Sequence, residues 1–206
     1  MVRSWRDLLR KLIYIPIVHT EDDMGSMAEF VKKEYKRKYS RQQWNQHKKI
    51  VNDLWTETRE KIFSLSVNWH KVRVYQDGLP VCGKEQDIVK SLAEKGSLNH
   101  KLVIELQQKG AMIEGTENPE LLLAEYNHIM KIAHAENIAD RDRLIEKYSK
   151  VSAELLSKRD WFIADRINKT LKKGETGLLF LGLMHQANKL IEKNINVKYL
   201  DIGAFK

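Results

Sequence analysis

The sequence predicts a single α/β domain spanning residues 1–206, with a mainly parallel central sheet of about five short strands and a large helical layer. Short apolar runs of strand length recur along the chain. Stretches with helical periodicity separate these runs, and several of them end at a single glycine, the usual left-handed cap. Strands separated by helices generally pair in parallel. With 206 residues, the chain is long enough for one good core.

The N-terminal part begins with a strand and continues with a long helical insertion. The first strand is expected at residues 12–18, where Pro16 would remove one ladder hydrogen bond and suggests a strand end or an irregular position. A helical segment at about 26–66 is inserted between the first two strands. Ser40 and Gln43 have the spacing of a capping box, which predicts that this segment is two helices.

The remaining elements alternate between strands and helices. Short alternating or buried runs predict further strands at residues 72–75, 111–113, 178–182 and 197–200. Apolar periodicity and turn residues predict helices at 85–95, 98–109, 119–135, 140–173 and 187–193. Asn118 followed by Pro119 is a typical helix start.

Composition excludes several classes of protein. The chain is 42% hydrophobic and 31% charged, as expected for a globular domain. No apolar stretch approaches the roughly 20 residues that span a bilayer, and the short N-terminal hydrophobic segment has no cleavage site of a signal peptide. The single cysteine, Cys82, cannot form an internal disulfide. These features predict a cytoplasmic protein with no membrane partner.

The net charge of +8 is concentrated in a basic stretch at residues 32–49 that also contains aromatic side chains. The basic residues are Lys32, Lys33, Lys36, Arg37, Lys38, Arg41, Lys48 and Lys49. Such a helix can bind the phosphate backbone of a nucleic acid. The simpler interpretation, which we favour, is a solvated helix face whose aromatic side chains turn inward.

Histidine and acidic residues follow the predicted strands. His19, Asp77, Glu114 with Glu117, and His185 each lie just past a strand. The carboxyl ends of parallel strands share one edge of the sheet, where open sheets bind their ligands, so these side chains are expected to face one pocket.

Imidazole and carboxylate ligands suit zinc, manganese or iron, which predicts a divalent metal held by His19, Glu114 and His185. Without a metal, the same groups can act as general acid and base. Arg159 is a candidate to neutralise a buried carboxylate or to bind an anionic substrate, and the alternative is an ion-pair network on one helix surface.

The C-terminal part of the chain resembles a known family. From Arg159 the sequence opens a helix with Arg-Asp, ends it at Gly174, and continues through an apolar strand into Gly182-Leu183-Met184-His185. This pattern is similar to the signature of the TraB/Tiki family, within the wider erythromycin-esterase/ChaN-like superfamily. An N-terminal strand ending in histidine, as at His19, is also typical of that family. The resemblance implies an α/β fold and a metal-dependent hydrolase site, in a superfamily that also includes haem-binding proteins.

The leading hypothesis is therefore a metal-dependent hydrolase of esterase or peptidase type that acts on a small-molecule or peptide substrate. His19 and His185 would be metal ligands or acid–base groups, and Asp77 with Glu114 or Glu117 would complete the site. Arg159 would orient or bind the substrate. One alternative is a non-catalytic protein that binds a small ligand such as haem. Another is nucleic-acid binding through the basic stretch 32–49.

Overall fold

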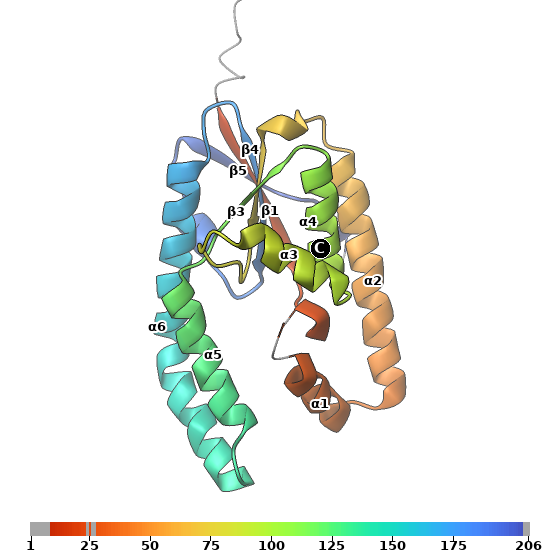
Figure 1. Cartoon of the computed structure of the whole chain (residues 1–206), viewed down its shortest axis with the longest axis vertical. Coiled ribbons are helices and arrows are strands. Elements are labelled where there is room, and N and C mark those ends of the chain that lie inside the picture. The colour runs from red at the N-terminus through yellow and green to blue at the C-terminus, as the bar shows by residue number, and fades with distance from the viewer. Residues whose placement is uncertain (1–8, 24, 26–27, 204–206) are drawn as a thin grey trace, which may run out of the picture.

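The computed structural model describes residues 9–23, 25 and 28–203 and has the predicted α/β fold (Figure 1). Within these residues, five strands form one sheet in the order β3-β2-β4-β1-β5, and every pair is parallel. The strands are β1 (Arg10–Ile17), β2 (Val72–Gln76), β3 (Met112–Glu114), β4 (Thr176–Gly182) and β5 (Ile195–Tyr199). The helices are α1 (Ala28–Lys38), α2 (Arg41–Phe63), α3 (Glu85–Glu94), α4 (Leu98–Gln108), α5 (Pro119–Ala133) and α6 (Ile138–Thr170).

Helices cover both faces of the sheet, which explains why the central strands are apolar throughout. In β4, the central strand, every residue after Thr176 is buried. Successive side chains of a strand alternate between faces. Phe180 accordingly packs into a core cluster with residues of α2, α3 and α4, whereas Leu179 packs against Ile163 and Ile167 of α6. Each fully buried aliphatic side chain stabilises such a core by about 1.5–3 kcal/mol.

The helical insertion has the predicted division into two helices. Ser40 caps α2 by accepting a hydrogen bond from the backbone N–H of Gln43, and the Gln43 side chain accepts one from the Ser40 N–H. The apolar stripe of α2 is buried at Val51, Leu54 and Ile62. The sequence therefore defined this helix at its start and along its buried face.

Pro16 lies at the end of β1, beyond the last residue that pairs with β5, in agreement with the missing N–H of proline. Two local predictions need correction. The predicted helix at 187–193 is a short 3-10 turn, Ala187–Leu190, because few residues separate β4 from β5. α6 begins at Ile138 rather than at 140, because Asn137 caps it by accepting a hydrogen bond from the Asp140 N–H.

The helices extend well past the carboxyl edge of the sheet. In Figure 1, α5 and the first half of α6 run beyond the strands on one side, and α1 with the start of α2 does so on the other. No helix among the described residues is both long and apolar enough to cross a membrane. The carboxyl edge therefore lies between two helical arms, which we call the α1–α2 arm and the α5–α6 arm.

Candidate active site at the carboxyl edge of the sheet

Side chains from distant parts of the chain meet at a cavity of about 610 Å³ at the carboxyl edge of the sheet. His19, Asp77 and His185 follow β1, β2 and β4 and line this cavity. Glu125 of α5 and Arg159 of α6 line it as well. The structure therefore brings together two histidines from opposite ends of the sequence, as expected from their positions after parallel strands.

Asp77 connects most of these groups. Its backbone N–H donates to the Phe180 carbonyl at 2.9 Å, which continues the β2–β4 pairing by one residue. Its Oδ2 accepts hydrogen bonds from His19 Nε2 at 3.0 Å and from the Gly182 N–H at 2.9 Å, and its Oδ1 accepts one from Arg159 Nη2 at 2.9 Å. Burial alone would raise the pKa of the Asp77 carboxyl, but the hydrogen bond from His19 and the nearby positive charges hold it well below its usual range. Asp77 is therefore a buried, ionised carboxylate.

Arg159 joins three carboxylates. Its Nε and Nη2 donate to the two oxygens of Glu117 at 3.1 and 2.5 Å, and its Nη1 donates to Glu125 at 2.5 Å, in addition to the bond with Asp77. Burial would lower the pKa of Arg159, but these carboxylates raise it, so the guanidinium stays charged. Its four hydrogen bonds all go to these carboxylates, whose negative charge the guanidinium partly neutralises. The alternative of a surface ion-pair network is excluded, because Arg159 is buried.

Glu117 is fully buried beside this guanidinium. Its position is fixed by the backbone, because its N–H donates to the Leu79 carbonyl and its own carbonyl accepts from the Val81 N–H. Burial raises the pKa of the Glu117 carboxyl, and the charge of Asp77 raises it further, against the opposite effect of Arg159. Of the three carboxylates that share this guanidinium, Asp77 is therefore more acidic than Glu117.

A second carboxylate–imidazole pair is formed by Asp160 and His185. His185 Nδ1 lies 2.6 Å from Asp160 Oδ1, and the other oxygen of Asp160 accepts the Gln186 N–H at 2.9 Å. His185 Nε2 lies 3.6 Å from Asp77 Oδ2. Burial would lower the pKa of His185, but Asp160 and Asp77 raise it above its ordinary value. Two adjacent residues of α6 thus serve the site, because Arg159 binds the acidic residues and Asp160 orients the imidazole.

His19 is the more accessible of the two imidazoles. Its side chain is 36% exposed, compared with 5% for His185. Burial would lower the pKa of His19, but the hydrogen bond to Asp77 raises it above its ordinary value. The loop that carries His19 is held by Asp23, which accepts hydrogen bonds from Thr20 and from Ser97 at the start of α4. Both histidines are therefore fixed by carboxylates at the same cavity.

Gly182 allows this close packing at the end of β4. A Cβ atom there would lie 3.0 Å from Asp77 Oδ2 and 3.4 Å from His19 Nε2. Because both contacts are tighter than a side chain normally makes, a larger residue would separate Asp77 from His19. The glycine of the Gly-x-x-His pattern thus has a physical role in the site.

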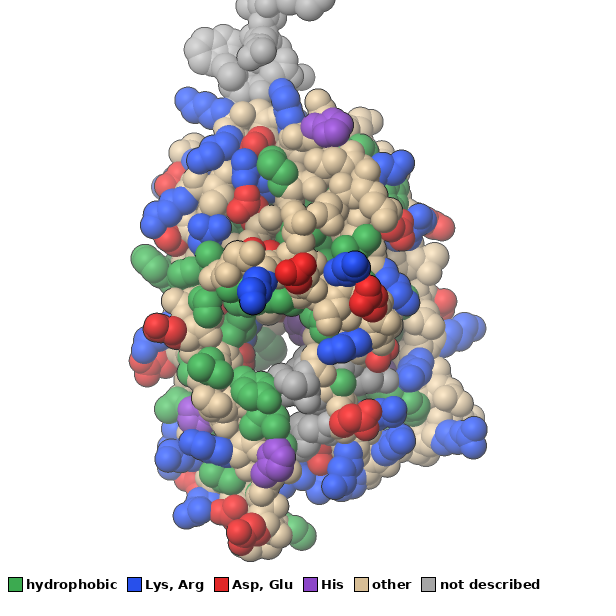
Figure 2. All heavy atoms as spheres, in the orientation of Figure 1, with side chains coloured by type: hydrophobic (Ala, Val, Ile, Leu, Met, Phe, Trp, Pro, Cys, Tyr) green, Lys and Arg blue, Asp and Glu red, His purple; other side chains and the backbone are tan. Residues whose placement is uncertain are grey.

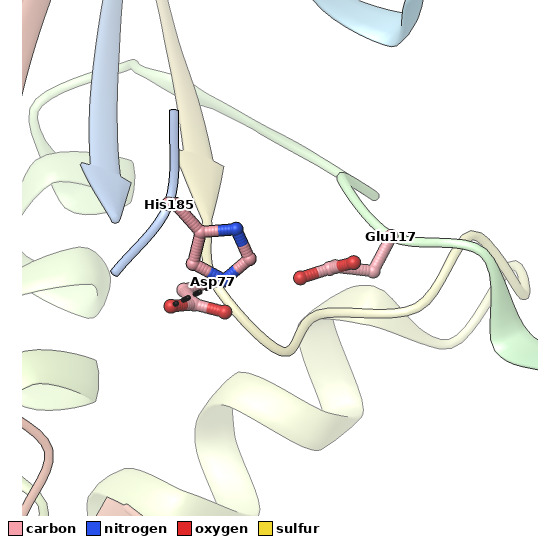
Figure 3. A group of neighbouring side chains, drawn as sticks. All are labelled: Asp77, Glu117 and His185. Carbon is pink, nitrogen blue, oxygen red and sulfur yellow. Dashed lines mark ion pairs between the residues drawn. The ribbon is translucent and has the colours of Figure 1, made fainter. Parts of the chain in front are cut away.

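Asp77, Glu117 and His185 are close enough to hold a metal ion, because one ligand atom from each lies within 4.8 Å of the others (Figure 3). However, a divalent ion bound to both carboxylates would lie beside the Arg159 guanidinium, which already donates to each of them. Two cations so close together in a buried site repel each other strongly. A divalent ion there would have to share Asp77 and Glu117 with Arg159, although the three carboxylates around this one guanidinium leave net negative charge in the group. Of the predicted ligands His19, Glu114 and His185, only His185 belongs to it.

Glu114, predicted as a ligand or catalytic group, lies elsewhere. It pairs with Arg73 and, at 3.5 Å, with Arg166, and it is not among the residues that line the cavity. The register aligns Glu114 with Tyr75, so the chain has not yet reached the level of Asp77 at this point. The sequence did not decide which of the two glutamates belongs to the site, and the structure shows that Glu117 does.

Two contributors were missed by sequence reasoning. Asp160 is one of them, because no sequence pattern described above indicates its contact with His185. Its position next to Arg159 in the Arg-Asp pair was the available signal. Glu125 comes from the middle of α5 and has no sequence signal, because only the packing of α5 against α6 places it near Arg159.

The aromatic residues of the basic stretch stack on one another between α1 and α2. The Tyr35 ring lies 5.0 Å from Trp44 and 5.7 Å from both Tyr39 and His47, measured between centroids. Figure 2 shows basic side chains dispersed over the visible surface rather than gathered in one continuous patch. Tyr35 and Trp44 are half-buried in this stack, whereas Tyr39 is 41% exposed, so the aromatic side chains turn inward only in part, and nucleic-acid binding stays a prediction.

Comparisons with known proteins add no assignment. No family model matches the chain, and no curated protein or solved structure matches it. The likeness to the TraB/Tiki signature therefore remains a resemblance carried by the motifs around Arg159 and His185.

Proposed function

We propose that this chain is a hydrolase of esterase or peptidase type, and that His19 and His185 act as general base and general acid. The observation that carries the proposal is the pair of carboxylate–imidazole contacts at one cavity, Asp77 with His19 and Asp160 with His185. A carboxylate that binds one imidazole nitrogen fixes the tautomer and orientation of the ring, so the other nitrogen is set to exchange a proton.

The roles of the two imidazoles follow from their surroundings. His185 is faced by two carboxylates, at 2.6 and 3.6 Å, and therefore holds its proton more firmly. His19 has one such partner and is more exposed, so it is the better group to accept a proton from water. In this reaction His19 takes a proton from water while the water oxygen attacks the acyl carbon. The bond to the leaving oxygen or nitrogen then breaks as His185 donates its proton to that atom.

Arg159 and Glu117 have a supporting role in this proposal. The guanidinium keeps Asp77 ionised and fixed, and Asp77 in turn orients His19. This arrangement makes the acid–base version preferable to a zinc, manganese or iron centre, since the carboxylates that such an ion needs are already bound to Arg159.

The test is hydrolysis of p-nitrophenyl butyrate and of a fluorogenic peptide, before and after dialysis against a chelator. We expect turnover of at least one substrate that survives chelation, and a loss of about 10²- to 10⁴-fold in His185→Ala, the range that general acid–base groups contribute. His128→Ala is the control, because His128 lies on α5 and is not among the residues that line the cavity. Loss of activity on chelation, with recovery on adding zinc, would support the metal-dependent version instead. No turnover of any ester or peptide would contradict the proposal.

A further inference from the structure

Apart from its polar groups, the cavity has a largely apolar lining. Leu122 and Ile129 of α5 and Leu156 of α6 line it, together with Leu183 and Met184 after β4. Although α5 is mostly apolar in sequence, none of its residues is fully buried. Its apolar side chains therefore contribute to the wall of the cavity more than to a closed core. Figure 2 shows hydrophobic side chains beside the hollow between α5 and the α1–α2 arm.

The charges at the cavity select against anions. Asp77, Glu117 and Glu125 all bind to one guanidinium, that of Arg159. Arg159 is the only arginine, and there is no lysine, among the described residues that line the cavity. A ligand carboxylate or phosphate would have to displace one of these carboxylates from Arg159 and lie beside the others. This corrects the expectation that Arg159 binds an anionic substrate.

We propose that the cavity accepts an uncharged apolar acyl chain, which lies against α5 and α6 while its carbonyl group reaches His19 and His185. This inference rests on the proposed hydrolase function and specifies its substrate class as an ester or amide of an apolar acid. A cavity of about 610 Å³ lies in the range that holds small-molecule ligands. Leu183 and Met184, which also line the cavity, are 58% and 77% exposed, so the cavity is open to solvent at these two side chains.

The first experiment compares p-nitrophenyl acetate, butyrate and hexanoate with the p-nitrophenyl monoester of adipate. Adipate matches hexanoate in length but ends in a carboxylate. We expect kcat/KM to rise about fourfold for each added methylene, as burial of about 0.8 kcal/mol per CH₂ predicts. We expect hexanoate to exceed the adipate monoester on the order of 100-fold, because an unpaired charge is costly to bury. A flat series, or equal rates for these two esters, would overturn the inference.

A matched pair of variants tests the wall directly. Leu122 lines the cavity, whereas its neighbour Leu123 is 57% exposed and does not. Leu122→Glu should abolish the preference for hexanoate over acetate, and Leu123→Glu should retain it. If Leu122→Glu fails to fold by circular dichroism, Leu156→Ala tests the same wall, and it should lower that preference severalfold. An unchanged preference in a folded wall variant would contradict the proposed position of the acyl chain.

Binding of an unreactive ligand separates this inference from the hydrolase proposal. Hexan-2-one and octan-2-one carry the carbonyl and the apolar chain but have no leaving group. Tighter calorimetric binding of octan-2-one, by about tenfold or more, supports the acyl cavity even if no ester is hydrolysed. Hydrolysis without any dependence on chain length, and no ketone binding, would leave the hydrolase standing and overturn the acyl cavity.

Discussion

At the residue scale, the pKa shifts of the two imidazoles predict how activity depends on pH. The ordinary value is 6.5, and the pKa values of both His19 and His185 are raised above it by carboxylates. A base works only when deprotonated and an acid only when protonated. The rate should therefore rise with pH as His19 loses its proton, reach a maximum above pH 6.5, and fall as His185 loses its own.

This profile is measured as kcat/KM for a neutral ester from pH 5 to 10. Because both imidazoles face Asp77, the two apparent pKa values belong to the pair rather than to either ring alone. A rate that is independent of pH over the whole range would contradict the assigned roles.

Asp160 provides a second prediction at this scale. It contacts His185 but does not line the cavity, so it acts as a positioning residue. Asp160→Asn removes a charge that raises the pKa of His185, so the alkaline limb of the profile should move to lower pH. We also expect kcat to fall about 10- to 100-fold with little change in KM, because the imidazole loses its orientation.

The control for this variant is Asp165→Asn on the same helix, where Asp165 pairs with Lys169. That variant should leave both kcat and the pH profile unchanged. An unshifted alkaline limb in Asp160→Asn would show that Asp160 has only a structural role.

At the element scale, an ion pair connects the two helical arms. Both terminal nitrogens of Arg141 on α6 donate to the carboxylate of Glu34 on α1, at 3.1 and 2.6 Å. The hydrogen bonds from Arg141 lower the pKa of Glu34. The side chains of Glu34 and Arg141 are 29% and 21% exposed, so solvent screens the pair and its contribution is small.

A double-mutant cycle with Glu34→Gln and Arg141→Gln measures this contact. We predict a coupling free energy of about 0.5 kcal/mol in urea unfolding, which decreases in high salt. The pair Lys150–Glu146, within α6, is the control, because it does not connect two elements. A coupling energy of zero at low salt would mean that the arms are not joined by this pair.

The elements that the sequence predicted well are those with local signals. The capping box at Ser40 and the Asn118-Pro119 start fix α2 and α5 through hydrogen bonds to nearby backbone N–H groups. β5 begins earlier than the sequence predicts, and the predicted helix before it is only a short turn. No local sequence signal marks these two boundaries, because they depend on where β5 pairs with β1.

At the scale of the whole molecule, parallel topology explains why the site could be predicted in outline. Residues that follow parallel strands meet at the carboxyl edge of the sheet. His19, Asp77 and His185 therefore lie at one cavity, although they come from three parts of the chain. The choice between Glu114 and Glu117 could not be made in this way. It depends on the register of β3 against β2 and on the path of the chain toward α5, which only the packed structure determines.

The central claim is that His19 and His185 work as one catalytic unit. It is tested most directly by the kcat/KM of His19→Ala, His185→Ala and the double variant on p-nitrophenyl hexanoate. Groups that act in the same step are strongly non-additive. We predict that kcat/KM falls about 10²- to 10⁴-fold in each single variant. In the double variant, kcat/KM should be no more than about tenfold below that of the less active single variant. Single variants with the native rate, or losses that multiply in the double variant, would contradict the claim.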